Sequence, residues 1–443
     1  MATGMEQNID DLVKELILTS DMNKKKDVTG KIIELAKSKN IYLSSIHDLY
    51  IEQGKGKGTN FTVPAMNLRS LTYYLAKAIF RVAKKSNAGA FIFEIAKSEM
   101  GYTDQPPIEY TGVILAAAIK EKYSGPIFIQ GDHCQIKAKA YFEDPKKEIA
   151  ALKHLIEDCV SAGFFNIDID SSTIVDLKKS TTTEQQRNNF QTCAELTKFI
   201  RAIQPKGIMV SVGGEIGEVG GKNSTIEELK AFMDGYLSSC YPSLPRGTAG
   251  ISKISVQTGT SHGGVVLPDG TIAEVKVDFD TLKKLSAHAR EVYHLGGAVQ
   301  HGASTLPDRA FNKFPEIGTI EIHLATNFQN MIFDSPKFPK ALKEKIYDWT
   351  RKSCPEERKE GQSEDQFIYK ARKKALGPFK KDIMSLPEEI KEGIAQEIEK
   401  NFEFLFKQLN VGNTKDLVNK VIKPVDVELG LRSKAVLDGE GDD

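Results

Sequence analysis

The sequence has little cysteine, no excess of charge of either sign and no long apolar run, and each lack argues against a class of protein. Its five cysteines form no C-x-x-C pair, which argues against a disulfide framework and fits a reducing cytoplasm. The 60 basic and 60 acidic residues cancel, so nothing favours a nucleic-acid partner or an anionic membrane. No apolar run could span a bilayer, and the polar, acidic stretch 1–11 is unlike a signal peptide. We therefore expect a cytoplasmic protein.

Composition and periodicity divide the 443 residues into four segments. Residues 9–40 show helical spacing of apolar side chains, and a stretch rich in lysine and glycine at 54–58 ends that pattern. Beyond residue 335 the sequence is rich in lysine and glutamate and again helical. We predict a helical N-terminal lead-in (1–58), a barrel catalytic domain (59–335), a C-terminal helical extension (336–436) and a disordered acidic tail (437–443).

Short apolar strands alternate with helices through the middle of the chain, which predicts a parallel sheet. The expected strands are 61–65, 90–95, 126–130, 164–170, 208–212, 251–256, 297–300 and 319–322. Eight strand–helix units favour closure into a (β/α)8 TIM barrel. The main alternative is an open doubly wound sheet, which should carry a glycine fingerprint after an early strand, and none is present.

Polar side chains follow five of these strands, at the end of a barrel where active sites lie. We predict that His133, His262 and His301 bind a metal, with Glu215 as a fourth or alternative ligand. Three imidazoles with a carboxylate suit Zn²⁺ in a site with an open position. Asp170 is placed to hold a second divalent or a monovalent cation. Cys134 could also be a ligand, but a small apolar residue is the simpler interpretation.

Glycines follow two of the predicted ligands, at Gly263 and Gly302, and Ser304 lies close behind the second. Glycine allows backbone N–H groups to approach a bound anion, so these loops could hold a phosphate. The last strands of such barrels are the usual place for a phosphate site. The alternative is that the glycines only form tight turns.

Six motifs, taken in order, resemble those of the class II, zinc-dependent fructose-bisphosphate (ketose-bisphosphate) aldolases. They are Pro64-Ala65-Met66-Asn67, Asp132-His133, Ile169-Asp170-Ser171-Ser172, the loop from Glu215 to Gly221, His262-Gly263, and the segment from His301 to Asp308. The resemblance covers roughly residues 60–330 and suggests a divergent, long member of the family.

The resemblance implies a mechanism and a role for each residue. Zn²⁺ bound by the three histidines would polarise the ketone carbonyl of the substrate and stabilise an enediolate. Asp132 would move a proton to or from the C4 oxygen, and Glu215 would be the ligand onto which a mobile metal exchanges. A homodimer or higher homo-oligomer is typical of the family. The residues expected to contact the phosphorylated sugar are Gly263, Gly302, Ala303, Ser304, His323 and Thr326.

Two segments depart from the family pattern. They leave open which residue acts as the catalytic base and which sugar is the substrate. The family follows its G-G with an acidic pair, whereas Gly221 is followed by Lys222 and Asn223. Its eighth strand usually reads K-x-N-x-x-T-D; here the Thr is kept as Thr326, but His323 replaces the Asn and Asn327 the last Asp.

The leading hypothesis is a metal-dependent aldolase that cleaves fructose 1,6-bisphosphate to glycerone phosphate and glyceraldehyde 3-phosphate. Alternatives are an aldolase for another phosphorylated ketose and a non-catalytic barrel partner of a tagatose-bisphosphate-type aldolase. The altered Lys222-Asn223 loop favours the partner, whereas the retained His-Gly pairs favour the enzyme. A metal hydrolase is disfavoured because the first strand lacks the H-x-H that such barrels usually carry. Arg372, Lys373 and Lys374 are candidates for a second phosphate by charge alone.

Overall fold

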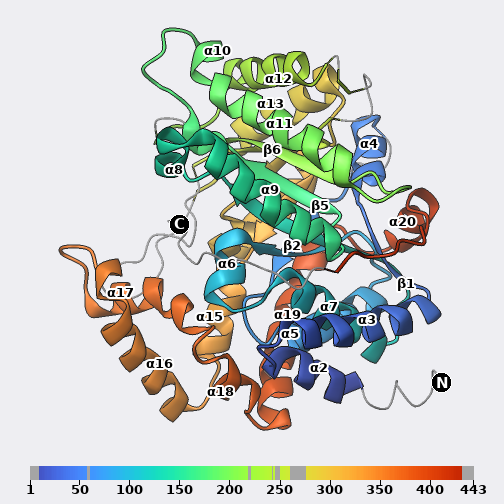
Figure 1. Ribbon diagram of the computed structural model, residues 1–443, viewed down its shortest axis with the longest axis vertical. Helices are drawn as coiled ribbons and strands as arrows, with labels where there is room; N and C mark the ends of the chain where they lie inside the picture. Colours follow the sequence, from blue (N-terminus) through green and yellow to red (C-terminus); the bar gives the residue numbers. More distant parts are fainter. Residues whose placement is uncertain are drawn as a thin grey trace.

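A computed structural model describes residues 9–56, 60–217, 221–241, 243–244, 250–259 and 276–431. Its centre is a closed barrel of parallel strands surrounded by helices (Figure 1), which confirms the predicted (β/α)8 fold. The barrel strands are β2 (Val63–Asn67), β3 (Ile92–Ala96), β4 (Gly125–Gln135), β5 (Asn166–Asp170), β6 (Ser211–Gly217), β7 (Lys253–Val256), β8 (Ala298–Gln300) and β9 (Glu321–Leu324). Pairing of β2 with β9 closes the ring.

Several strands end later than the apolar runs predict. The third was expected at 126–130, yet β4 continues through Asp132 and His133 to Gln135. The fifth was expected at 208–212, yet β6 runs to Gly217. Backbone ladder hydrogen bonds do not depend on side-chain polarity, so pairing continues past the last apolar residue. Asp132, His133 and Glu215 therefore belong to strands, which hold them more rigidly than loops would.

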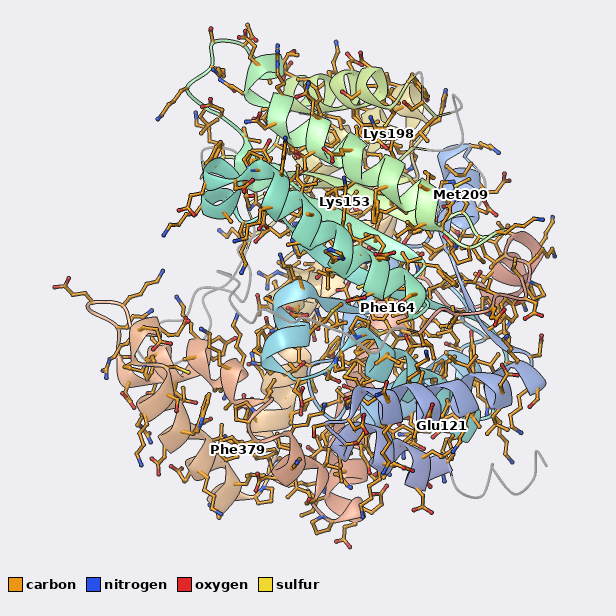
Figure 2. All side chains as sticks on the ribbon, viewed as in Figure 1. Glu121, Lys153, Phe164, Lys198, Met209 and Phe379 are labelled. Atoms are coloured by element: carbon orange, nitrogen blue, oxygen red, sulfur yellow. The ribbon has the colours of Figure 1, made fainter. Side chains whose placement is uncertain are left out.

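Helices connect the strands and cover the outside of the barrel. They are α5 (Thr72–Lys85), α6 (Lys97–Tyr102), α7 (Pro107–Lys120), α8 (Ala138–Glu143), α9 (Pro145–Ser161), α10 (Thr182–Gln185), α11 (Arg187–Ile203), α12 (Ile226–Cys240), α13 (Phe279–Tyr293), α14 (Lys313–Ile317) and α15 (Thr326–Asp334). Figure 2 shows α9 and α11 side by side, and Lys153 of α9 pairs with Glu195 of α11 at 2.6 Å.

The N-terminal segment contains the expected helices α2 (Ile9–Leu18) and α3 (Met22–Ser38), then α4 (His47–Gly54). It also contains a strand that the periodicity did not predict, β1 (Ile41–Ser44), which pairs in parallel with the first residues of β4. A four-residue strand is too short to show a period in the sequence. The lead-in therefore extends the sheet outside the barrel.

The C-terminal segment packs on the barrel helices. It comprises α16 (Lys340–Ser353), α17 (Glu364–Ala371), α18 (Lys380–Met384), α19 (Glu388–Gln408) and α20 (Lys415–Val421). Helix α19 lies against α5, where Arg81 pairs with Glu399 at 2.7 Å. Its predicted apolar stripe is buried in the same hydrophobic core as the barrel. Among the helices in the described ranges, none has the length and hydropathy to cross a membrane.

Candidate active site at the barrel mouth

The interior of the barrel is ionic, where bulky branched side chains are usual. Lys253 of β7 is fully buried, and its ammonium group lies 2.5 Å from Oε1 of Glu321 and 3.0 Å from a carboxylate oxygen of Asp168. It also donates to Oε1 of Gln130 at 2.7 Å, and Gln130 donates to Glu94 at 3.0 Å. We name this set the ionic floor; its members are Glu94, Gln130, Asp168, Lys253 and Glu321.

A glycine makes room for the ionic floor. A Cβ at Gly213 of β6 would overlap Oδ1 of Asp168 and lie 3.0 Å from Cε of Lys253. We predict that Gly213→Ala lowers the free energy of unfolding by about 1–3 kcal/mol, as overpacking of a filled interior does. Urea denaturation measures the loss. The control is Gly30→Ala in helix α3, where a Cβ meets nothing within 4 Å and Ala should be neutral or stabilising. Equal effects at the two sites would contradict the packing argument.

One step closer to the mouth, a bulge in β4 aims two adjacent side chains into the barrel. The register with β5 shifts between Gly131 and Cys134, and His133 has a left-handed backbone with φ of 39°. Neighbours on a regular strand point to opposite faces, and a bulge removes that alternation. Nε2 of His133 consequently lies 3.9 Å from Oδ1 of Asp132. Cys134 is buried beside them, and burial raises the pKa of its thiol, as expected for a packing residue.

His133, Glu215 and His301 form what we name the outer group. Nδ1 of His133 lies 3.6 Å from Oε2 of Glu215 and 3.3 Å from Oδ2 of Asp170. The rings of His133 and His301 have centroids 4.3 Å apart. Ligand atoms of the three outer-group residues all lie within 4.8 Å of one another, a spacing that one divalent cation can span. The donor set of two imidazoles and a carboxylate fits Zn²⁺ or a similar ion.

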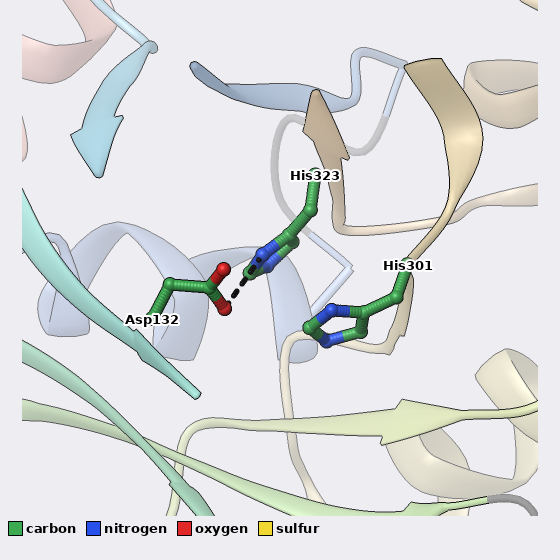
Figure 3. A group of neighbouring side chains, drawn as sticks. All are labelled: Asp132, His301 and His323. Atoms are coloured by element: carbon green, nitrogen blue, oxygen red, sulfur yellow. Dashed lines mark ion pairs between the residues drawn. The ribbon is translucent and has the colours of Figure 1, made fainter. Parts of the chain in front are cut away.

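A second set of side chains lies deeper, on the barrel axis side of the outer group. Asp132, His301 and His323 offer ligand atoms within 4.8 Å of one another (Figure 3). Oδ1 of Asp132 is 3.1 Å from Nδ1 of His323, and Nε2 of His323 contacts Oε1 of Glu321 at 2.7 Å. His323 thus connects the barrel mouth to the ionic floor.

Negative charge exceeds positive charge in this interior. The described residues place six carboxylates there against one ammonium group and three imidazoles: Glu94, Asp132, Asp168, Asp170, Glu215 and Glu321 against Lys253, His133, His301 and His323. Burial, together with the Asp170 carboxylate, raises the pKa of Glu215 to about 8. Burial also opposes ionisation of Asp132, yet His133 and His323 hold the pKa of its carboxyl well below its usual range. A bound divalent cation would relieve the repulsion between these carboxylates.

The predicted phosphate contacts lie at the exits of β8 and β9. Gly302 has a left-handed backbone with φ of 66°, which glycine adopts without strain. Ala303 and Ser304 follow it in a short 3-10 turn, Ala303–Thr305. Thr326 is the first residue of α15, and Ser304 lines a small cavity with Asn327, the second residue of that helix. His262 and Gly263 lie outside the described residues.

Two of the three cationic candidates for a second phosphate, Arg372 and Lys374, have partners within the protein. Arg372 is buried in the helical extension, where its guanidinium donates to Oδ1 of Asn330 at 2.8 Å and to the hydroxyl of Tyr347 at 3.0 Å. Lys374 pairs with Glu357. These contacts hold α15, α16 and the extension together, so a packing role explains both side chains.

The ionic floor was missed in the sequence analysis, although a signal for it is present. Gln130, Asp168 and Glu321 each lie two positions before a mouth residue on the same strand, namely Asp132, Asp170 and His323. Side chains two positions apart on a strand point to the same face, so each of these residues points into the barrel like the mouth residue that follows it. A polar residue inside a strand that is buried on both sides therefore indicates a polar barrel interior.

The sequence of residues 54–407 matches the family model described as fructose-bisphosphate aldolase class-II. No curated protein matches the chain. Among solved structures, a fructose-bisphosphate aldolase from Campylobacter jejuni is 17% identical, with TM-score 0.50, covering 84% of this chain and 96% of its own. A probable tagatose 6 phosphate kinase from Sinorhizobium meliloti 1021 is 14% identical, with TM-score 0.54 and coverages of 81% and 99%. A fructuronate-tagaturonate epimerase from Cohnella laeviribosi is 11% identical, with TM-score 0.50 and coverage of 82% for each. At these identities the structures show the shared fold alone.

Proposed function

Because the chain belongs to the class II fructose-bisphosphate aldolase family, we propose that it is a zinc-dependent aldolase that cleaves fructose 1,6-bisphosphate reversibly to glycerone phosphate and glyceraldehyde 3-phosphate. The observation that carries the proposal is the convergence of the outer group with Asp132 at one barrel mouth. Aldol cleavage breaks the C3–C4 bond of a ketose. It requires a group that polarises the carbonyl, such as a bound metal, and a carboxylate nearby that moves a proton.

Each residue of the mouth has a separate task in this proposal. His133, His301 and Glu215 hold the cation, with His262 as a further predicted ligand. When bound there, a divalent cation would supply polarisation of the ketone carbonyl of the sugar. Asp132 moves the proton at the C4 hydroxyl, because the bulge in β4 holds its carboxylate beside the outer group. Asp170 contacts His133 and orients its ring, as carboxylates beside metal-binding histidines do.

The phosphate of the substrate fits the exits of β8 and β9. Gly302 and Ser304 follow β8, and the 3-10 turn Ala303–Thr305 contacts α15, which begins at Thr326. A helix N-terminus with nearby N–H groups favours an anion. Gly263 would complete this site.

Another phosphorylated ketose is the second candidate substrate. His323 and Asn327 occupy positions where the family carries an Asn and an Asp that contact substrate. The family's loop acid is also replaced: Asn223 donates to Oδ2 of Asp278 at 3.1 Å, at the start of α13. An amide held in this way cannot accept a proton from substrate. The reaction therefore needs another base, and substrate choice can shift with it.

Aldol cleavage of fructose 1,6-bisphosphate before and after chelation tests the proposal. We expect cleavage by the purified protein, loss of cleavage after EDTA treatment and recovery on addition of Zn²⁺. Cleavage that is unaffected by complete metal removal would contradict the metal-dependent mechanism. Bound zinc without cleavage would favour another ketose phosphate, and neither zinc nor cleavage would favour the non-catalytic partner. Gel filtration and fractionation test two further proposals, a homo-oligomer and a cytoplasmic location.

A further inference from the structure

His323 connects two strands of the barrel that are not neighbours. It lies on β9 and Asp132 lies on β4, and β2 and β3 separate these strands in the sheet. Nδ1 of His323 lies 3.1 Å from Oδ1 of Asp132 across the interior (Figure 3). This ion pair is shorter than the one between Oδ1 of Asp132 and Nε2 of His133, at 3.9 Å. The carboxylate of Asp132 is therefore closer to a side chain across the barrel than to the imidazole next to it in the chain.

The ring of His323 is itself held from several sides. Nε2 contacts Oε1 of Glu321 at 2.7 Å, and the same oxygen pairs with the Lys253 ammonium group at 2.5 Å. Nδ1 lies 3.1 Å from Oε2 of Glu94, and the ring packs against that of His301, with centroids 4.1 Å apart. All of these side chains are buried. In a close-packed interior such contacts leave the ring one orientation.

Both nitrogens of His323 face carboxylates, so neither is left for a sugar hydroxyl. An imidazole has only two polar atoms, and the protonated ring offers an N–H at each of them. Nδ1 faces Asp132 and Glu94, whereas Nε2 faces Glu321. The ring is 4% exposed. A side chain with these contacts acts on a substrate through the group that it holds.

We propose that His323 is a positioning residue, which holds the carboxylate of Asp132 beside the outer group by linking it to Glu321 of the ionic floor. This role rests on the proposed function, in which Asp132 moves the proton at the C4 hydroxyl. The carboxylate must lie within hydrogen-bond reach of that proton, and a displacement of about 1 Å can cost about 100-fold in rate.

Two amide substitutions separate the contacts of His323. The amide nitrogen of Asn is as many bonds from Cβ as Nδ1, so His323→Asn keeps a donor that faces Asp132. The amide nitrogen of Gln is as many bonds from Cβ as Nε2, so His323→Gln keeps the contact with Glu321 and loses the one with Asp132. The two variants therefore differ in the contact that the proposal makes important.

Steady-state kinetics with fructose 1,6-bisphosphate compare the two variants. We expect kcat to fall by about 100-fold in His323→Gln and by less than about tenfold in His323→Asn, with KM in both within about twofold of the wild type. A raised KM with unchanged kcat would make His323 a substrate contact. An equal fall of kcat in the two variants would show that the contact with Asp132 does not matter. Either result would overturn the proposal.

A double-mutant cycle distinguishes positioning from a general effect on the fold. In an Asp132→Asn background the group that His323 holds is already lost. Adding His323→Gln to that background should therefore change kcat by less than about threefold. A further loss of about 100-fold, equal to the loss in the wild-type background, would assign His323 a structural role and contradict the proposal.

Urea unfolding of the metal-free variants tests the contact without an activity assay. The effects of His323→Gln and Asp132→Asn on the unfolding equilibrium constant should deviate from additivity by about tenfold. The matched control is Asp170→Asn, which alters a buried carboxylate of the same mouth that contacts His133 and Gln135. Its effect should add to that of His323→Gln within about twofold.

This measurement separates failure of the proposed function from failure of the inference. Coupling between His323 and Asp132 in a protein that does not cleave fructose 1,6-bisphosphate would refute the proposed function, while His323 would still hold Asp132. Additive effects would refute the role of His323 whatever the activity. If circular dichroism shows that His323→Gln does not fold, His323→Ala, which also lacks the contact with Asp132, replaces it in every comparison.

Discussion

Replacing Lys253 by Met should lower the free energy of unfolding by about 3–5 kcal/mol, the largest stability loss that we expect from a single substitution. The ammonium group is buried between the carboxylates of Asp168 and Glu321, with contacts of 3.0 and 2.5 Å. Met fills similar volume but leaves two carboxylates buried without their cation. Glu321 also accepts hydrogen bonds from the hydroxyl of Tyr50 and the side-chain amide of Gln130, and it contacts Nε2 of His323, but the two neutral donors cannot replace an ammonium group.

Urea denaturation of the metal-free protein measures this effect. The matched control is Lys153→Met, which removes the pair with Glu195 on the surface of α9 and α11, where both side chains are partly exposed. An exposed pair contributes about 0–1 kcal/mol, so the control should unfold almost like the wild type. Adding Glu321→Gln to Lys253→Met removes one unpaired charge and should recover part of the loss. A Lys253→Met variant as stable as the control would show that the ionic floor is not held by charge.

The sequence predicted the barrel because the pattern that indicates it, alternating apolar strands and helices, can be recognised in short stretches of the chain. Each apolar strand, such as 126–130, is followed by helical spacing, and repetition of that unit leaves few topologies. The strand ends were less predictable. The sequence around His133 does not predict a bulge, because a left-handed φ at a non-glycine residue arises from tertiary packing. The strand β1 was missed for a similar reason, since it is too short to carry its own period.

The candidate site divides in the same way. The barrel rule selects residues at strand exits, so Asp132, His133 and Glu215 could be named from the sequence before any distance was known. The surroundings of His323 could not be predicted in this way. The sequence placed it among the substrate contacts, and nothing in the sequence predicted that Asp132, Glu94 and Glu321 would be its neighbours. Its environment depends on three other strands, and a single sequence contains no information about which inward residues share a layer.

Replacing His133 by Ala should lower kcat/KM for aldol cleavage by about 1,000-fold or more. A bound cation contributes several kcal/mol to stabilisation of charge in the transition state, and each 1.4 kcal/mol corresponds to a factor of ten. His133 belongs to the outer group with Glu215 and His301, so its replacement by Ala removes one imidazole ligand from the proposed metal site. The protein should lose one zinc equivalent and keep its fold, since the ring contributes to the mouth of the barrel and little to its core.

The control for this experiment is His154→Ala, which removes an exposed imidazole from α9 and should retain both zinc and activity. Steady-state kinetics with fructose 1,6-bisphosphate and metal analysis on the same samples separate two causes of failure. If His133→Ala loses activity but keeps all its zinc, His133 acts on the substrate and the outer group is wrong. If it loses zinc but keeps activity, the metal does not act in catalysis, and the proposed aldolase mechanism is wrong. Loss of both, with an unchanged circular dichroism spectrum, is the result that the geometry of the outer group requires.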